Sequence, residues 1–149
     1  MLDFVYENQT TDQKWSEQFF VNIFEHSFKH LGLGDKQIEL GLHLILPDRS
    51  QGLNREHRHK DRPTDVLSFP LDEHSLEKYG ILPIGDIFIC LEVAERQAEE
   101  INIPIDQEMA RLAVHGLLHL LGYDHETSSE DEKKMIDLQE DIIATLPKS

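Results

Sequence analysis

The sequence predicts an α+β fold in which a small mixed β-sheet packs against helices. Strand-like and helix-like segments both occur along the chain, but they do not alternate regularly as they would in a parallel α/β protein. The chain has 149 residues, which is long enough to bury one hydrophobic core. No internal repeat, low-complexity tract or Pro/Ser-rich linker marks a boundary. We therefore expect a single domain over residues 1–149.

Short apolar segments between turn residues predict the strands. From 37 to 46, every second residue is apolar, which is typical of a strand with one buried face, and Pro47 and Asp48 end it. The continuous apolar run IFIC indicates a strand that is buried on both faces. In chain order, the predicted strands are 2–6 (LDFVY), 37–46 (QIELGLHLIL), 67–69 and 87–90 (IFIC).

Apolar residues at helical spacing predict the helices. In the first helix the apolar positions include Trp15, Phe19 and Ile23, and the sequence GLG at 32–34 stops it. The predicted helices are 11–31, 91–101, 106–121 and 129–144. The apolar side of the last one is expected to consist of Met135, Ile136, Leu138, Ile142 and Ile143.

The chain is strongly acidic, with 14 Lys and Arg against 29 Asp and Glu and a formal net charge of −15. By itself this charge argues against a nucleic-acid partner. No apolar run is long enough to cross a bilayer, and the first residues lack the features of a signal peptide. Cys90 is the only cysteine, so it cannot form an internal disulfide. We expect a cytoplasmic protein with no membrane partner.

One short segment departs from this acidic balance. Residues 49–62 (RSQGLNREHRHKDR) contain five basic residues, two acidic residues and two histidines. By contrast, residues 124–141 contain eight acidic residues and two lysines, which we interpret as a solvated surface. The basic segment points weakly to an anionic ligand.

Three histidines near the C-terminus are the candidate metal-binding residues. His115 and His119 are four residues apart on the helix predicted at 106–121, so their side chains are neighbours on one face. His125 cannot join them if the helix continues, because ten residues of helix would carry it about 15 Å along the axis. Gly122 allows the helix to end and the chain to turn back, because glycine adopts left-handed conformations without steric penalty. We therefore predict that a turn brings the third histidine to the first two.

Three imidazoles at this spacing predict one bound Zn²⁺ ion. They leave one tetrahedral position open, as in catalytic zinc sites. The spacing also matches the zinc-protease pattern H-E-x-x-H-x-x-G-x-x-H, but Gly116 replaces its general-base glutamate. Glu108 lies on the same helical stripe two turns away, too far to replace that residue. Peptide hydrolysis is therefore disfavoured, whereas metal binding is not.

The segment VHGLLHLLGYDH (114–125) resembles the signature of the YbeY family of rRNA maturation endoribonucleases. Two further segments are similar to that family and follow in its order, LNREHRHKDRPTDVLSFP (53–70) and GDIFIC (85–90). The stretch from the first of these segments to the last, residues 53–125, covers about half of the chain. One departure is His57, where the family usually has a tyrosine before the arginine.

This resemblance implies an activity and a set of roles. It implies a zinc-dependent endoribonuclease that acts on single strands in rRNA processing, including maturation of the 16S rRNA 3′ end, and in ribosome quality control. His115, His119 and His125 would be the zinc ligands, and Arg58 would be the arginine of the active-site cleft. A guanidinium suits that role, because its planar donors match a phosphate and stabilise charge in the transition state.

The expected partner is ribosomal RNA or its precursor, with ribosomal proteins as further partners and no DNA. We expect zinc, Arg58, Lys60 and Arg62 to form a local positive cleft in the acidic surface, with Lys60 and Arg62 binding RNA. The general base stays open between a metal-activated water and the 2′-OH of the RNA. Asp65 has two interpretations: it caps the turn after Pro63 and Thr64, which we favour, or it orients a ligand histidine.

Two alternative functions stay open at this point. One is a metal-dependent hydrolase of peptides or small molecules that uses the same three histidines. The other is a non-catalytic ribosome-associated zinc protein whose metal organises the C-terminal helix and turn. An ordered fourth protein ligand would favour the second alternative, and the sequence offers no persuasive candidate for one.

Overall fold

A computed structural model describes residues 2–71, 80–123 and 129–147. Its sheet has four strands in the order β1-β2-β4-β3. The middle strand β2 runs parallel to both β1 and β4, whereas the edge strand β3 runs antiparallel to β4. The strands are β1 (Leu2–Asn8), β2 (Gln37–Ile45), β3 (Val66–Pro70) and β4 (Ile81–Cys90). The sheet is thus mixed, as the sequence predicts for an α+β fold.

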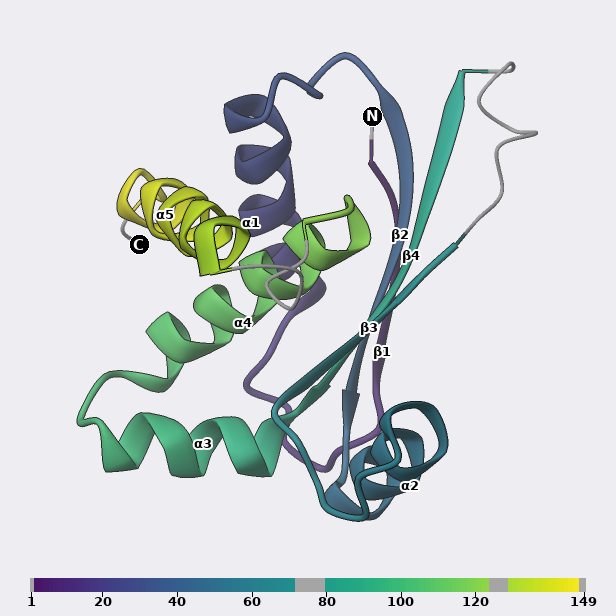
Figure 1. Cartoon of the computed structure of the whole chain (residues 1–149), viewed down its shortest axis with the longest axis vertical. Helices are drawn as coiled ribbons and strands as arrows, with labels where there is room; N and C mark the ends of the chain where they lie inside the picture. The colour runs from purple at the N-terminus through teal and green to yellow at the C-terminus, as the bar shows by residue number, and fades with distance from the viewer. Residues whose placement is uncertain (1, 72–79, 124–128, 148–149) are drawn as a thin grey trace.

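In the described part of the chain, five helices accompany the sheet. They are α1 (Glu17–His30), α2 (Pro47–Arg58), α3 (Leu91–Glu100), α4 (Ile105–Leu120) and α5 (Ser129–Ala144). Figure 1 shows α1, α3, α4 and α5 gathered on one side of the sheet, while α2 lies apart from them at the end where β2 ends. The central helix is α4, which contacts α1, α3, α5, β3 and β4. None of the described helices is long and apolar enough to cross a membrane.

The core lies between the sheet and the helices on this side. It includes Phe20 and Phe24 of α1, Leu42 of β2 and Ile87 of β4, all fully buried. Helix α4 is buried on nearly every side: between residues 108 and 120, only three of its residues are more than marginally accessible to solvent. A helix enclosed in this way holds the side chains of its one open strip in fixed positions.

The first helix begins later than the sequence predicts. The expected start is Thr11, but α1 begins at Glu17, where the Ser16 hydroxyl accepts a hydrogen bond from the Phe19 N–H. Before it, the side chains of Asn8, Thr10 and Asp12 each accept a hydrogen bond from the backbone N–H two residues further along the chain. These local bonds compete with helix formation and keep this segment irregular.

Helix α2 is absent from the predicted elements. It begins with Pro47, but it lacks an apolar stripe, and its buried residues are the polar Ser50 and Asn54. Strand β4 begins at Ile81, six residues before the predicted start. Pro83 and Gly85 hide this part of the strand from sequence patterns, and the register with β2 shifts at this point.

Two apolar positions also differ from the prediction. Leu46 lies outside β2 as the N-cap of α2, and it is exposed. On α5, Ile136 is 44% exposed, while Gln139 is only 3% exposed and occupies the buried face with Met135 and Ile142. The position of Gln139 matters because it is beside a residue of the site described next.

Candidate active-site cleft

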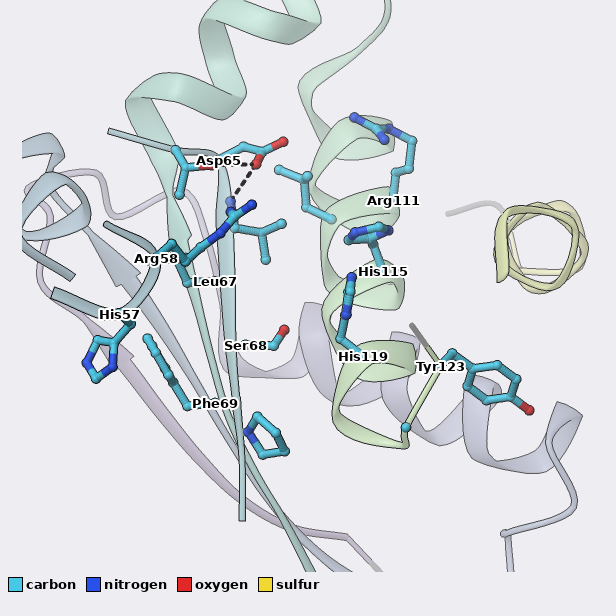
Figure 2. A pocket seen from close by; sticks show the side chains of 15 residues that line it. His57, Arg58, Asp65, Leu67, Ser68, Phe69, Arg111, His115, His119 and Tyr123 are labelled. Atoms are coloured by element: carbon cyan, nitrogen blue, oxygen red, sulfur yellow. Dashed lines mark hydrogen bonds between the residues drawn. The ribbon is translucent and has the colours of Figure 1, made fainter. Parts of the chain in front are cut away.

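The described residues form a cleft of about 890 Å³ between α4 and the edge strand β3. The C-terminal end of α2 closes one side of it. Figure 2 shows His115 and His119 on one wall, Ser68 and Phe69 on the facing wall, and Arg58 reaching in from α2. The cleft therefore joins two segments that are distant in sequence, the basic segment 49–62 and the histidine helix.

After its first turn, α4 has one open strip, and this strip faces the cleft. Between residues 108 and 120, the residues that are not buried are Arg111, His115 and His119, and all three line the cleft. They follow one another at intervals of four, so they form one row along the helix. The rings of His115 and His119 are 4.8 Å apart, centroid to centroid, at an angle of 69°. The predicted adjacency of these two histidines is thus present.

The last helix orients the first of these histidines. Nδ1 of His115 lies 2.7 Å from Oε1 of Gln139 on α5. Because an amide oxygen can only accept, Nδ1 carries the proton and Nε2 carries the lone pair in the neutral ring. Metal-binding histidines commonly have their second nitrogen held in this way. The ring of His115 therefore has the tautomer that a ligand through Nε2 requires.

Gly122 ends α4 as the sequence predicts, with a φ of 100°. The Tyr123 N–H donates to the Leu118 carbonyl, and the Gly122 N–H donates to the His119 carbonyl. These two bonds form a Schellman cap, which requires a residue with positive φ at the glycine position. His125 lies outside the described residues. The described part of the chain therefore contains no cluster of three metal-binding side chains.

The packing around Gly116 explains why a glutamate of the zinc-protease type is absent from this position. A Cβ atom at this position would lie 2.9 Å from Cγ2 of Ile87 on β4 and 3.2 Å from the Ser68 hydroxyl. The Ser68 hydroxyl also donates to the Gly116 carbonyl, which ties β3 to α4. The helix packs so closely on the sheet that any side chain here would force the helix and the sheet apart. Glu108 is also excluded as a substitute, because it is fully buried in an ion pair with Arg111.

Arg58 and His57 lie on the side of the cleft formed by α2. The Arg58 side chain is exposed, and no ion pair holds it among the described residues. The His57 ring packs edge-on against Phe69 of β3, with centroids 4.6 Å apart. An imidazole thus makes an aromatic contact with the edge strand at this position.

The other two predicted RNA-binding residues lie beside the cleft and do not line it. Lys60 and Arg62 belong to the exposed loop between α2 and β3. Asn54 anchors this loop: its side chain donates to the Arg62 carbonyl, and its own carbonyl accepts from the Lys60 N–H. The backbone of the loop is fixed, while both cationic side chains extend into solvent.

Asp65 caps the turn before β3, which is the interpretation that the sequence favours. Its Oδ1 accepts hydrogen bonds from the Val66 N–H at 2.7 Å and from the Thr64 hydroxyl (Figure 2). No hydrogen bond joins it to a histidine among the described residues. Asp65 therefore orients the strand that forms the wall of the cleft.

Sequence reasoning missed Arg111 and its partners. Nε and Nη2 of Arg111 each donate to one oxygen of Glu108 at 2.7 Å. These bonds to the carboxylate raise the pKa of the Arg111 guanidinium. With its amide oriented to satisfy both neighbours, Gln97 of α3 donates to Glu108 and Asp65. The available signal was the spacing, since Arg111 precedes His115 by the same four residues that separate His115 from His119.

Comparisons with known proteins agree with this architecture. The sequence model of a family described as Endoribonuclease YbeY matches residues 4–147. A protein of that name from Sulfurihydrogenibium sp. is 47% identical over 131 residues, covering 88% of this chain and 84% of the relative. Another, from Persephonella marina, is 40% identical and covers 91% and 86%. The solution structure of TM1509 from Thermotoga maritima superposes with a TM-score of 0.60 at 29% identity, over 94% of this chain and 86% of that one.

Proposed function

Because the chain belongs to the endoribonuclease YbeY family, and is thus a nuclease of the hydrolase class, we propose that it is a zinc-dependent enzyme that cuts single-stranded rRNA. Its proposed tasks are maturation of the 16S rRNA 3′ end and ribosome quality control, and its proposed location is the cytoplasm. One observation carries the proposal: a pair of adjacent histidines on a buried helix shares a cleft with the exposed guanidinium of Arg58, which forms no ion pair with any described residue.

We propose His115, His119 and His125 as the ligands of one zinc ion. The described pair fits this ion, because the two rings are adjacent and the bond to Gln139 fixes the His115 tautomer that has its proton on Nδ1. When bound, zinc supplies a Lewis acid that polarises a phosphoryl oxygen and increases the acidity of water. Because these histidines lie on an enclosed helix, they would hold the ion in a fixed position relative to the cleft.

Arg58 binds the scissile phosphodiester in this proposal. A guanidinium forms paired hydrogen bonds to two phosphate oxygens and keeps its charge at every working pH. No described carboxylate neutralises it, so its charge is available to the substrate. As negative charge builds up on the phosphoryl oxygens during cleavage, Arg58 stabilises the transition state more than the ground state.

The described part of the cleft offers little that could serve as a carboxylate base. Among the described residues that line the cleft, only Asp65 has a carboxylate. Its Oδ1 already accepts a hydrogen bond from the Val66 N–H. Glu108 is enclosed by Arg111 and Gln97. This arrangement disfavours the peptide-hydrolase alternative, which needs a carboxylate at position 116. We propose that either a metal-activated water or the 2′-OH of the RNA takes part in the proton transfer.

The acidic surface fits a substrate that is delivered by partners. With a formal charge of −15, the chain repels free RNA except near local cationic groups. Arg58, Lys60 and Arg62 form such a region beside the cleft. We therefore propose weak, salt-sensitive binding to free rRNA, with ribosomal proteins or other partners bringing the enzyme to its site.

The proposal is tested by cleavage of a structured rRNA precursor. Wild type, His119→Ala and the control His30→Ala are purified identically and loaded with zinc. His30 is an exposed residue of α1 outside the cleft, so its variant controls for loss of a histidine as such. We expect wild type and His30→Ala to cut and His119→Ala to be inactive. Equal cutting by all three would assign the activity to a contaminant and reject the proposed site. Binding of rRNA and zinc without cutting would favour the non-catalytic role.

A further inference from the structure

We propose that Arg111 is a second phosphate-binding residue of the cleft, which contacts a phosphate of the RNA next to the one held by Arg58. This inference rests on the proposed function, because it assumes a phosphodiester substrate. It goes beyond the proposed function by adding a contact on α4 itself, on the wall of the cleft opposite the basic segment.

The exposure pattern of α4 is the first observation. Between residues 108 and 120 every residue is buried except Arg111, His115 and His119, and these three line the cleft. Polar residues on such a helix occupy its open strip, and here that strip lines a concave cleft, where a few polar groups are expected to contact a ligand. Arg111 continues the row of the two histidines by one turn (Figure 2). It therefore occupies the same functional surface.

The donors of the guanidinium are the second observation. Arg111 gives Nε and one Nη2 hydrogen to the two oxygens of Glu108, in a paired arrangement with both distances at 2.7 Å. A guanidinium has five N–H donors, so the two on Nη1 and the second on Nη2 remain for other acceptors. The Arg111 side chain is 35% exposed, while Glu108 is fully buried. The carboxylate thus fixes the guanidinium from the protein side and leaves its outer edge toward the cleft.

The competing explanation is that Arg111 only neutralises the buried Glu108. That role requires the ion pair alone and no exposure to the cleft. Glu108 also accepts from the Gln97 amide, which bridges it to Asp65 at the turn before β3. The network therefore links α3, α4 and the strand of the opposite wall around the arginine. Such support is typical of a side chain that is held in place to bind a ligand.

The decisive variant removes both charges of this pair. Glu108→Gln/Arg111→Gln leaves the net charge of the protein unchanged and leaves no uncompensated charge in the interior. Its RNA affinity therefore reports the local contact and not a change in overall charge. The chain offers a matched control in Glu92→Gln/Arg96→Gln. That pair also joins an arginine to a glutamate, but it lies exposed on α3 and outside the cleft.

Binding is measured by fluorescence anisotropy with a labelled single-stranded RNA whose 2′-hydroxyls are methylated, using zinc-loaded proteins. We expect the Kd of Glu108→Gln/Arg111→Gln to rise about tenfold, as for loss of a hydrogen bond to a charged group. The slope of log Kd against log salt should fall by about 0.7, which corresponds to one fewer phosphate contact on a single strand. An affinity and slope equal to those of the control would overturn the inference.

A second variant keeps the test decisive if the double variant does not fold. Arg111→Lys keeps the charge beside Glu108 but loses the planar fork. We expect a rise in Kd of about threefold, intermediate between wild type and the double variant; an unchanged Kd would overturn the inference.

The behaviour of the wild type distinguishes failure of this inference from failure of the proposed function. If it binds and cuts RNA while both Arg111 variants bind equally well, only the role of Arg111 fails. If it neither binds nor cuts RNA, the proposed function fails and this inference with it.

Discussion

Nδ1 of His115 on α4 donates a hydrogen bond to Oε1 of Gln139 on α5, over 2.7 Å and across 24 positions of sequence. The last helix thereby sets the tautomer of a proposed zinc ligand. Gln139 is nearly inaccessible to solvent, so water does not compete for this bond. Without it, the proton of the neutral His115 ring would no longer be fixed on Nδ1.

Replacing Gln139 by leucine should therefore weaken zinc binding while leaving all three proposed ligands in place. We expect the zinc affinity to fall about 10- to 100-fold, as is usual when the partner of a ligand histidine is removed. The measurement is a competition titration against a chromophoric chelator, made at a temperature where the variant is folded. Gln139→Glu retains an acceptor and should keep most of the affinity. An unchanged affinity in Gln139→Leu would show that the bond does not orient a ligand.

The close packing at Gly116 gives a prediction about stability. In Gly116→Ala, the new methyl group would lie 2.9 Å from Cγ2 of Ile87, so α4 must move away from the sheet. We expect a loss of about 1–3 kcal/mol in the free energy of unfolding, measured in urea. Gly52→Ala is the matched control, because Gly52 is inside α2 and a Cβ there meets nothing within 4 Å. The control should be stabilised by about 0.5–1 kcal/mol. Equal stability of the two variants would contradict this account.

Arg58 and Arg55 allow the proposed phosphate contact to be tested within one helix. Arg58→Lys keeps a positive charge but loses the paired donors, so we expect kcat on rRNA to fall about 100-fold with a smaller change in KM. Arg55→Lys is the control, since Arg55 forms an exposed ion pair with Asp61 and does not line the cleft. It should keep wild-type kcat. If both variants cut at the wild-type rate, Arg58 does not act on the transition state.

The sequence predicts the histidine helix well because α4 is encoded locally. Its apolar periodicity is dense, and Gly122 marks its end with a residue that tolerates positive φ. Helix α2 escapes prediction because its buried residues, Ser50 and Asn54, are polar. They are buried through bonds to the loop that follows: Ser50 bonds to Thr64, and Asn54 bonds to Arg62. Such contacts exist only once the chain is folded.

The residues of the candidate site also fall into two groups, those that the sequence indicates and those that only the folded structure reveals. The spacing of His115 and His119 is visible in the sequence, and so is the position of Arg111 one turn earlier. Gln139 has no such signal, because it looks like a surface residue of an acidic helix until α5 packs on α4. The reason for glycine at position 116 is also tertiary, since the obstacle is Ile87 on another element. Partners that arise from packing are therefore the part that sequence patterns miss.

A histidine between two carboxylates on the sheet gives a prediction about acid stability. His43 of β2 lies 3.0 Å from Glu7 on β1 and 2.9 Å from Asp86 on β4, and its ring stacks on Phe88. The hydrogen bond from His43 lowers the pKa of the Glu7 carboxyl below its usual value of 4.5, with a further contribution from Gln9. A carboxylate with a lowered pKa stabilises the fold above its unfolded-state pKa, and this contribution is lost as the pH falls through the folded-state value.

In His43→Gln, we therefore expect the pKa of Glu7 to rise toward 4.5, as followed by carboxyl-carbon NMR. The stability difference between wild type and variant should shrink as the pH falls from above 4.5 to below the wild-type pKa of Glu7, since both proteins then carry a neutral Glu7. Gln9→Ala removes the lesser hydrogen bond and should raise the Glu7 pKa by a smaller amount. If the pKa of Glu7 is the same in wild type and His43→Gln, the bond across β1 and β2 does not hold this carboxylate in its charged form.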